Sequence, residues 1–363
     1  MSGVVKTNVP PTGAIYLLNM TYVSQCVGYY GAWIRNNTIR KINCLSTHPD
    51  WMSRNKDLFE KMTLGKIFLP GTHNSGSYGK EIPRPLHSRY TRWDRTHDCS
   101  VKAPFTLSTE TLLSLQDRDV FDQLVSGARY LDIRPCISNG DIRKYWVCHG
   151  PIFMHPLNGI IYDIKDFMTN THEIVILSFR EFPREYLKNH FDDFICLPMI
   201  LPVESITLGN IWKSNKRLIL SYDHPMQQTS TYLWPAISQF WPNAKTTDQL
   251  YNSIDGFENR KKDRSLLRSS TKIMRVTMAE MTLDAESVVS DSFAQLFGRG
   301  TESLFQLGVQ VGPLLTEWYN QKYNSTANIV AVDFIDATGI VEVAIDANKL
   351  RASPYFVDDF YYY

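Results

Sequence analysis

The sequence predicts an α/β fold built around a parallel β-sheet. Short and nearly continuous apolar runs of strand length recur along the chain, and helical patterns or long connections separate them. Residues 173–180, Glu-Ile-Val-Ile-Leu-Ser-Phe-Arg, are the clearest example. A run without polar alternation is typical of a strand buried on both faces, as the strands of parallel sheets are. Strands that alternate with helical segments further favour a parallel order.

Several segments have the composition of strands, and others have the apolar spacing of helices. The expected strands are residues 67–69, 128–135, 145–150, 173–180, 216–222, 272–276 and 328–335. The expected helices are residues 51–62, 114–127 and 160–167.

We divide the chain into three parts. Residues 1–50 form a β-rich N-terminal annex, with strands expected at 14–18 and 29–34, and this annex is too small to build a stable core of its own. Residues 51–350 hold the main domain. Residues 351–363 are an aromatic C-terminal tail that we expect to pack on the main domain or on a partner.

Composition and charge exclude several classes of protein. A net charge of +1 over 363 residues argues against a nucleic-acid binder held by bulk electrostatics. The chain has no run of about eighteen apolar residues, so we expect no transmembrane helix. The N-terminus lacks the apolar core of a signal peptide, which predicts a cytoplasmic protein if that end is complete. Asn-x-Thr sequons and an even number of cysteines, six, keep secretion open.

The first candidate functional residue is His73. It follows the apolar residues 67–69 and the turn residues Pro70 and Gly71, so it falls just past the C-terminal end of a strand. In parallel α/β proteins the reactive groups gather in the loops beyond these ends. This position therefore favours a catalytic histidine over a histidine in an ordinary loop.

Two further segments repeat this arrangement. Asp132 and Arg134 stand two residues apart at the end of the strand at 128–135, and His149 ends the apolar strand that starts at Tyr145. Histidines transfer protons near neutral pH. Arginine is the usual clamp for a phosphate group. The set therefore predicts a phosphate ester as the substrate.

These motifs together resemble a known family. Pro-Gly-Thr-His at 70–73, Arg-Tyr-Leu-Asp-Ile-Arg at 129–134 and the strand ending in His149 are similar to the X domain of phosphatidylinositol-specific phospholipase C. The resemblance is strongest to the small single-barrel members, namely the bacterial enzymes and the animal X-domain-containing proteins. It implies that the parallel sheet closes into a TIM-like (β/α) barrel, regular or irregular, with an eighth strand within residues 277–312.

The resemblance also implies roles for individual residues. His73 is the general base and His149 the general acid, Asp333 orients His73, and Asp132 orients His149. Arg134 contacts the phosphate. The implied substrate-binding residues are Asn74, Arg180 and Tyr222.

The family resemblance bears on metal dependence as well. The large eukaryotic phospholipases C hold calcium with an asparagine after the first histidine and with carboxylates, and Asn74 and Asp132 match two of those ligands. Arg134 stands where a further carboxylate is expected, and a guanidinium repels Ca²⁺. We therefore expect no metal and no cofactor.

The predicted function is metal-free cleavage of phosphatidylinositol or a related phospholipid through a cyclic phosphate. The predicted partners are the phospholipid and a transiently contacted membrane surface, with no nucleic acid and no obligate protein partner. Two alternatives stay open. One is an inositol-lipid-binding protein with weak activity, because the bacterial enzymes have aspartate where this chain has Asn74. The other is a metal-dependent barrel phosphodiesterase of the glycerophosphodiester or sphingomyelinase D type.

Overall fold

Eight parallel strands form the central sheet of the protein, which we describe from a computed structural model. The strands are β4 (Leu69–Thr72), β6 (Tyr130–Ile133), β10 (Val175–Phe179), β11 (Leu218–Tyr222), β12 (Leu233–Trp234), β13 (Ser238–Phe240), β14 (Arg275–Ala279) and β15 (Ile329–Val332). Their order is β12-β11-β10-β6-β4-β15-β14-β13. The structure describes residues 15–20, 28–35, 38–43, 47–78, 105–106, 115–138, 144–149, 152–180, 196–198, 203–230, 232–260, 274–282 and 304–353.

The two edge strands of this sheet, β12 and β13, follow each other directly in the chain. The sheet therefore curls round, and the fold is an irregular (β/α) barrel, which confirms the predicted class. Six predicted strands lie in the sheet, but residues 145–150 do not, because they pair antiparallel elsewhere. The other two barrel strands are β12 and β13, not a strand within 277–312. They are only two and three residues long, too short to show a period in the sequence.

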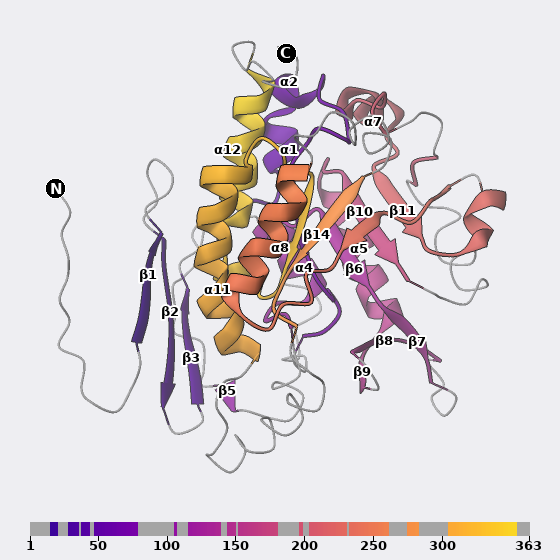
Figure 1. Cartoon of the computed structure of the whole chain (residues 1–363). Coiled ribbons are helices and arrows are strands. Elements are labelled where there is room, and N and C mark those ends of the chain that lie inside the picture. The colour runs from indigo at the N-terminus through magenta and orange to yellow at the C-terminus, as the bar shows by residue number, and fades with distance from the viewer. Residues whose placement is uncertain are drawn as a thin grey trace.

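Helices cover the strands and connect them (Figure 1). They are α1 (Trp51–Arg54), α2 (Lys56–Phe59), α4 (Val120–Ser126), α5 (Leu157–Asn170), α7 (Leu208–Ser214), α8 (Thr247–Arg260), α11 (Leu304–Trp318) and α12 (Ile340–Ala352). Short turns of 3₁₀ or π type occupy Pro225–Thr229, Tyr319–Tyr323 and Ile335–Ala337. None of the helices in the described ranges is long and apolar enough to cross a membrane.

Local sequence explains where individual helices begin and end. The helix expected at 114–127 starts only at Val120, because Asp119 accepts a hydrogen bond from the backbone N–H of Asp122 and caps that end. Gly127 ends it at φ 124°, a conformation that glycine adopts without steric cost. In α5 the buried side chains include Leu157, Ile160, Ile161, Ile164 and Phe167, the spacing that turns one helix face to the core.

A buried ion pair fastens the N-terminal end of the barrel. Arg129, just before β6, lies 2.7 Å from Glu173, just before β10, and both side chains are fully buried. The carboxylate of Glu173 also accepts hydrogen bonds from the backbone N–H groups of Met52 and Ser53 in α1. Breaking such a pair leaves an uncompensated buried charge, which costs about 3–5 kcal/mol. This end of the barrel is therefore built for stability.

A small antiparallel sheet lies apart from the barrel strands. It consists of β7 (Pro135–Ile137), β8 (Tyr145–His149) and β9 (Ile152–Pro156), and it sits below β6 in Figure 1, at the end of the molecule opposite α2 and α7. Residues 145–150 resemble a buried strand in composition, yet β8 is only partly buried. The chain enters β7 directly from β6, so the small sheet begins where the barrel strand ends.

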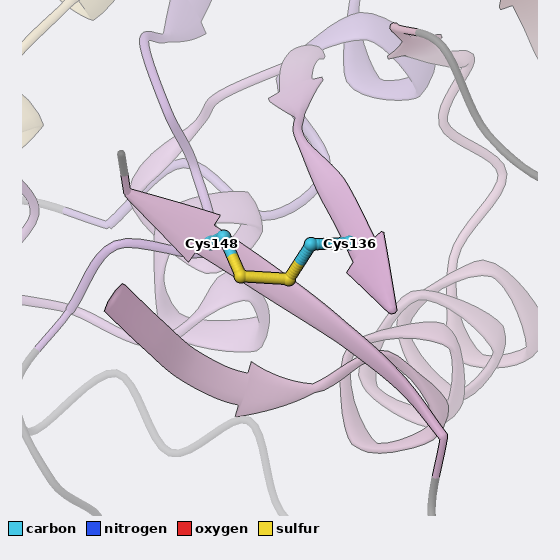
Figure 2. Close-up of a disulfide and its surroundings, with 2 residues drawn as sticks. All are labelled: Cys136 and Cys148. Atoms are coloured by element: carbon cyan, nitrogen blue, oxygen red, sulfur yellow. A yellow bond between two sulfur atoms is a disulfide. The ribbon is translucent and has the colours of Figure 1, made fainter. Parts of the chain in front are cut away.

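A disulfide ties two strands of this small sheet together. Cys136 of β7 and Cys148 of β8 form the bond, with their Cα atoms 5.9 Å apart (Figure 2). Cys136 pairs in register with Trp146 rather than with Cys148, so the bond runs diagonally across the hairpin. Each cysteine is close in sequence to a predicted site residue, Arg134 or His149.

A second antiparallel sheet comes from the N-terminal part of the chain. Its strands are β1 (Ile15–Met20), β2 (Gly28–Arg35), β3 (Thr38–Asn43) and β5 (Phe105–Thr106). Strands were expected in this annex, but β5 comes from far outside residues 1–50. The three-part division of the chain stays a prediction. Most of the predicted aromatic tail lies outside the described residues.

Candidate active site

His73 and Asp333 meet at the C-terminal ends of two paired strands. β4 and β15 are parallel neighbours in which Thr72 lies opposite Val332, so the residues that follow each strand are adjacent. His73 Nδ1 lies 2.8 Å from Asp333 Oδ1. The backbone N–H of His73 donates to the carbonyl of Val332 at 3.0 Å. The pairing of the strands thus creates the predicted contact, while the roles of the two residues stay predictions.

The charges around His73 favour its protonated form. Burial lowers the pKa of the His73 imidazole, but the nearby Asp333 carboxylate, its hydrogen bond and the charge of Glu280 outweigh burial and the opposing effect of Arg134. The result is a pKa above the ordinary value of histidine. His73 is only 5% exposed, and its Nε2 atom is buried without a hydrogen-bond partner. One ring nitrogen is therefore fixed and the other is left to act on a ligand.

Asp132 and Arg134 form the next part of the site, at the end of β6. Arg134 Nε donates to Asp132 Oδ2 at 3.0 Å, and Asp132 is fully buried. The same oxygen accepts from the backbone N–H of Asn74 at 3.0 Å. These contacts hold the guanidinium and the His73 loop against each other. Asp132 Oδ1 has no hydrogen-bond partner, and its predicted contact with His149 stays a prediction.

Asn74 has an unusual backbone and an unsatisfied side chain. Its φ is 46°, in the left-handed region that asparagine tolerates better than most residues. Both atoms of its side-chain amide are buried without hydrogen-bond partners. Native proteins rarely leave such atoms unpaired. The amide of Asn74, His73 Nε2 and Asp132 Oδ1 together therefore mark a site for a polar ligand.

Trp241 connects several of these groups and was missed by sequence reasoning. It follows β13, a strand too short and too polar to be recognised from the sequence. The guanidinium groups of Arg134 and Arg180 lie 5.0 and 5.1 Å from the centre of its ring. The His73 ring meets it edge-on, with centroids 5.4 Å apart. Tyr222, the predicted aromatic, is instead fully buried and stacks on His224.

Arg180 lies at the exposed end of β10. Its Nε donates to Gln239 Oε1 at 3.1 Å, and Gln239 in turn donates to the hydroxyl of Tyr130 at 2.9 Å. Burial raises the pKa of the Tyr130 hydroxyl well above its ordinary value, and Asp132 adds to this effect. Arg180 is thus held beside Trp241, in the position of a cation that can meet an anionic group.

His149, the predicted acid, ends β8 of the small sheet rather than a barrel strand. The backbone N–H of the preceding residue, Cys148, donates to the carbonyl of Arg134 at 3.0 Å, which ties the end of β8 to the end of β6. A close contact joins this sheet to the His73 loop as well. A Cβ atom added at Gly76 would lie 2.5 Å from a methyl group of Val147 in β8, so only glycine fits there.

Glu280 is a further carboxylate that sequence reasoning did not select. It follows β14, is 5% exposed, and accepts a hydrogen bond from Thr282 at 2.9 Å. One donor atom each from His73, Glu280 and Asp333 lies within 4.8 Å of the others. Within this cluster Asp333 binds His73 Nδ1, and the charge of Arg134 also acts on His73.

Comparisons with known proteins place this site in context. No protein-family model matches the chain. PI-PLC X domain-containing protein 1 of Mus musculus is 26% identical over 329 residues, which span 85% of this chain and 89% of that protein. The variant-surface-glycoprotein phospholipase C of Trypanosoma brucei brucei is 24% identical over 234 residues, which span 58% of this chain and 63% of that protein.

A solved structure agrees with the fold. A mutant phosphatidylinositol-specific phospholipase C from Staphylococcus aureus superposes with a TM-score of 0.55 at 16% identity, over 82% of this chain and 97% of that one. The fold and these relatives define the class, an α/β-barrel enzyme of the phospholipase C type. The same matches give the family resemblance: the chain is similar over most of its length to the PI-PLC X domain-containing proteins.

Proposed function

We propose that this protein cleaves phosphatidylinositol or a related phospholipid by attack of a neighbouring hydroxyl group on phosphorus. The O–H bond of the attacking hydroxyl breaks, a new P–O bond closes a cyclic phosphate, and the bond to the diacylglycerol oxygen breaks. The observation that carries this proposal is the state of His73, whose Nδ1 is held by Asp333 at 2.8 Å while its Nε2 is buried without a partner.

The first step of this reaction is proton removal by His73. A general base needs one ring nitrogen without a proton and the other held in a fixed tautomer. The hydrogen bond to Asp333 supplies the second condition. The imidazolium that forms is stabilised by that carboxylate, because an opposite charge at hydrogen-bond distance favours the charged form. Asn74, with its unpaired amide, is suited to bind the attacking hydroxyl or a phosphate oxygen.

The second step needs a cation at the phosphate and an acid at the leaving group. Arg134 is held by Asp132, so its guanidinium is already oriented when negative charge develops on the phosphate oxygens. His149 is the proposed acid, which protonates the departing alkoxide. Its fixed place at the end of β8, beside the carbonyl of Arg134, supports this role.

The residues do not fit the calcium site of the large eukaryotic relatives. Such a site needs oxygen ligands around the metal, typically about six to eight. Here the guanidinium of Arg134 lies 3.0 Å from Asp132 Oδ2. A positive side chain therefore occupies the carboxylate that would bind calcium, and we derive no step through a metal.

Two other functions have an observation in their favour. The asparagine at position 74 supports an inositol-lipid binder of low activity, because an amide transfers no proton. The cluster of His73, Glu280 and Asp333 supports a metal-dependent phosphodiesterase, because its donor atoms converge within 4.8 Å. We favour the metal-free enzyme because it accounts for the ion pair of Arg134 and the hydrogen bond of His73 together.

A turnover assay separates these functions. Radiolabelled phosphatidylinositol in vesicles is incubated with the protein, with and without a chelator, and the water-soluble product is identified by ³¹P NMR. The proposal expects a cyclic phosphate in both conditions. Bound vesicles without product support the lipid binder. Turnover that stops in chelator and returns with a divalent cation supports the metal-dependent enzyme and contradicts the proposal.

A further inference from the structure

Glu280 is a buried carboxylate for which the reaction above has no use. It follows β14, next to β15 in the barrel, so it reaches the same strand ends as Asp333 from the neighbouring position. Only 5% of the residue is exposed. A buried carboxylate is costly unless it is protonated or compensated by a nearby charge. Thr282 satisfies one of its oxygens at 2.9 Å, but a hydroxyl does not compensate a full charge.

The surroundings of Glu280 hold three other ionisable groups. His73 comes from the end of β4 and Asp333 from the end of β15, each with an atom within 4.8 Å of the Glu280 carboxylate. Arg134, at the end of β6, acts on the same group through its charge. The described residues of α11 that line the same cavity as Glu280 are Leu307, Gly308, Val311, Gly312 and Leu315, none of which titrates. Among the described residues, the ionisable groups that act on Glu280 are therefore His73, Asp333 and Arg134.

Glu280 and Asp333 also share a wall of one small cavity. The cavity has a volume of about 20 Å³, which is room for about one water molecule. Water is therefore scarce between the two carboxylates, and their charges are weakly screened. The protonation state of Glu280 must therefore change the electrostatic energy of the protonated His73 ring.

We propose that Glu280 is a positioning residue of the His73 base, placed so that the imidazolium forms beside an ionised carboxylate. This inference rests on the proposed function, in which His73 removes the proton. Before the reaction His73 Nε2 carries no proton, so it can accept the proton of the substrate hydroxyl. When the O–H bond breaks, that proton moves to the imidazole, where the ionised Glu280 carboxylate opposes the new positive charge.

The directions of the pKa values agree with this geometry. Burial raises the pKa of the Glu280 carboxyl, His73 opposes that change, and Asp333 adds to it. Glu280 in turn helps to raise the pKa of His73. Two groups that interact this closely titrate as a pair rather than one by one.

The test is the titration of the His73 ring in Glu280→Gln, followed by ¹H–¹⁵N NMR of the imidazole nitrogens. Glutamine keeps the shape and the acceptor for Thr282 but cannot ionise. We expect the His73 midpoint to move to lower pH, and the acid limb of the pH–rate profile to move with it. The plateau rate should fall by less than the roughly hundredfold that marks the loss of a general base.

Two further variants keep the test decisive. Glu258→Gln removes another fully buried carboxylate, one bonded to Thr277 and Thr326, and should leave the His73 midpoint in place. Glu280→Asp serves if Glu280→Gln does not fold. It keeps the negative charge but moves it away from His73, so the His73 midpoint in Glu280→Asp should still lie below that of the wild-type chain. An unchanged midpoint in every folded Glu280 variant overturns the inference.

The titration does not depend on turnover, so the two proposals can fail separately. If the midpoint moves in a chain that cleaves no lipid, the coupling of Glu280 and His73 stands and the proposed function falls. If lipid is cleaved and neither the midpoint nor the acid limb moves in Glu280→Gln, the function stands and the role of Glu280 falls.

Discussion

The two proposed proton-transfer groups of this enzyme are held in different ways. His73 belongs to the barrel: it is buried, follows β4, and is fixed by a carboxylate from the neighbouring barrel strand. His149 belongs to the small sheet: it is partly exposed, ends β8, and stands beside a disulfide that fastens the hairpin (Figure 2). The base depends on the packed core, and the acid depends on a covalent bond in a peripheral element.

Because the two histidines are held differently, different changes in the protein should affect each of them. Perturbations of charge inside the barrel should act on His73, whereas redox conditions and movements of the hairpin should act on His149. The contacts between the barrel and the small sheet include the backbone bond from Cys148 to Arg134, the packing of Gly76 on Val147, and the stacking of Tyr78 on His155. Variants that affect one side only can show how independent the sides are.

The largest effect is expected from removing either histidine. His73→Ala and His149→Ala should each lower turnover by roughly 10²–10⁴-fold, because each removes a proton-transfer group. They should differ in stability: His73→Ala should lower the melting temperature, since it leaves the largely buried Asp333 side chain without its partner, and His149→Ala should not. His172→Ala, at an exposed position before β10, is the control and should keep full turnover. Near-normal activity of either site variant contradicts the assignment.

Arg134→Lys should have the next largest effect. Lysine keeps the charge but loses the planar fork that matches a phosphate, so we expect turnover to fall by roughly 10²-fold. Substrate binding should fall less, since the cation matters most as charge develops in the transition state. Arg118→Lys, which alters the ion pair with Asp336, is the matched control. A destabilised variant with full activity per folded molecule would show that Arg134 has only a structural role.

Removing the disulfide should affect His149 without affecting His73. In the double variant Cys136→Ser, Cys148→Ser we expect a loss of stability of about 3 kcal/mol, the chain-entropy value for a loop of this length. We also expect a several-fold loss of turnover, with the NMR titration of His73 unchanged. Reductant added to the wild-type chain should give the same pattern, and Cys196→Ser serves as the cysteine control. If the His73 titration moves as well, the two sides are not independent.

The smallest effect concerns stability and pH. The pKa of folded His73 is raised above its ordinary value, so protonated His73 stabilises the fold. This stabilisation is fully present below the unfolded pKa of about 6.5 and is lost as pH rises through the higher folded value. Asp333→Asn should remove most of it. The change in melting temperature between about pH 6 and about pH 8 should therefore be smaller in Asp333→Asn than in the wild-type chain. If the melting temperature changes equally in both chains, the charge interaction between His73 and Asp333 is contradicted.

The barrel strands that are buried on both faces could be predicted, because they have long apolar runs in the sequence. Residues 173–180 and 216–222 contain β10 and β11, in which every residue is buried. β12 and β13 were not predictable, since two or three residues carry no period. The segment 145–150 was apolar enough for the barrel, but β8 pairs antiparallel with β7 and β9, and composition does not encode that pairing.

The candidate site followed the same rule. His73, Asp132 and Arg134 were found because they stand at or just after the C-terminal ends of recognisable strands. Trp241 escaped because β13 itself was not recognised. Glu280 escaped because the strand before it was expected to end at residue 276, three residues too early. Its closeness to His73 arises from the order of strands in the sheet, which one sequence does not reveal.

The packing of Gly76 has a consequence for mutational scanning. A library covering every substitution would record position 76 as intolerant, because even a methyl group would meet Val147 and Ile160. Gly71 would behave alike, since a methyl group there would lie 2.8 Å from Tyr130. Neither glycine has a side chain that could transfer a proton or bind phosphate. A functional map drawn from such a screen would therefore extend beyond the residues that perform the chemistry. Position 71 would mark the packing of β4 against β6, and position 76 would mark the contact between the barrel and the small sheet.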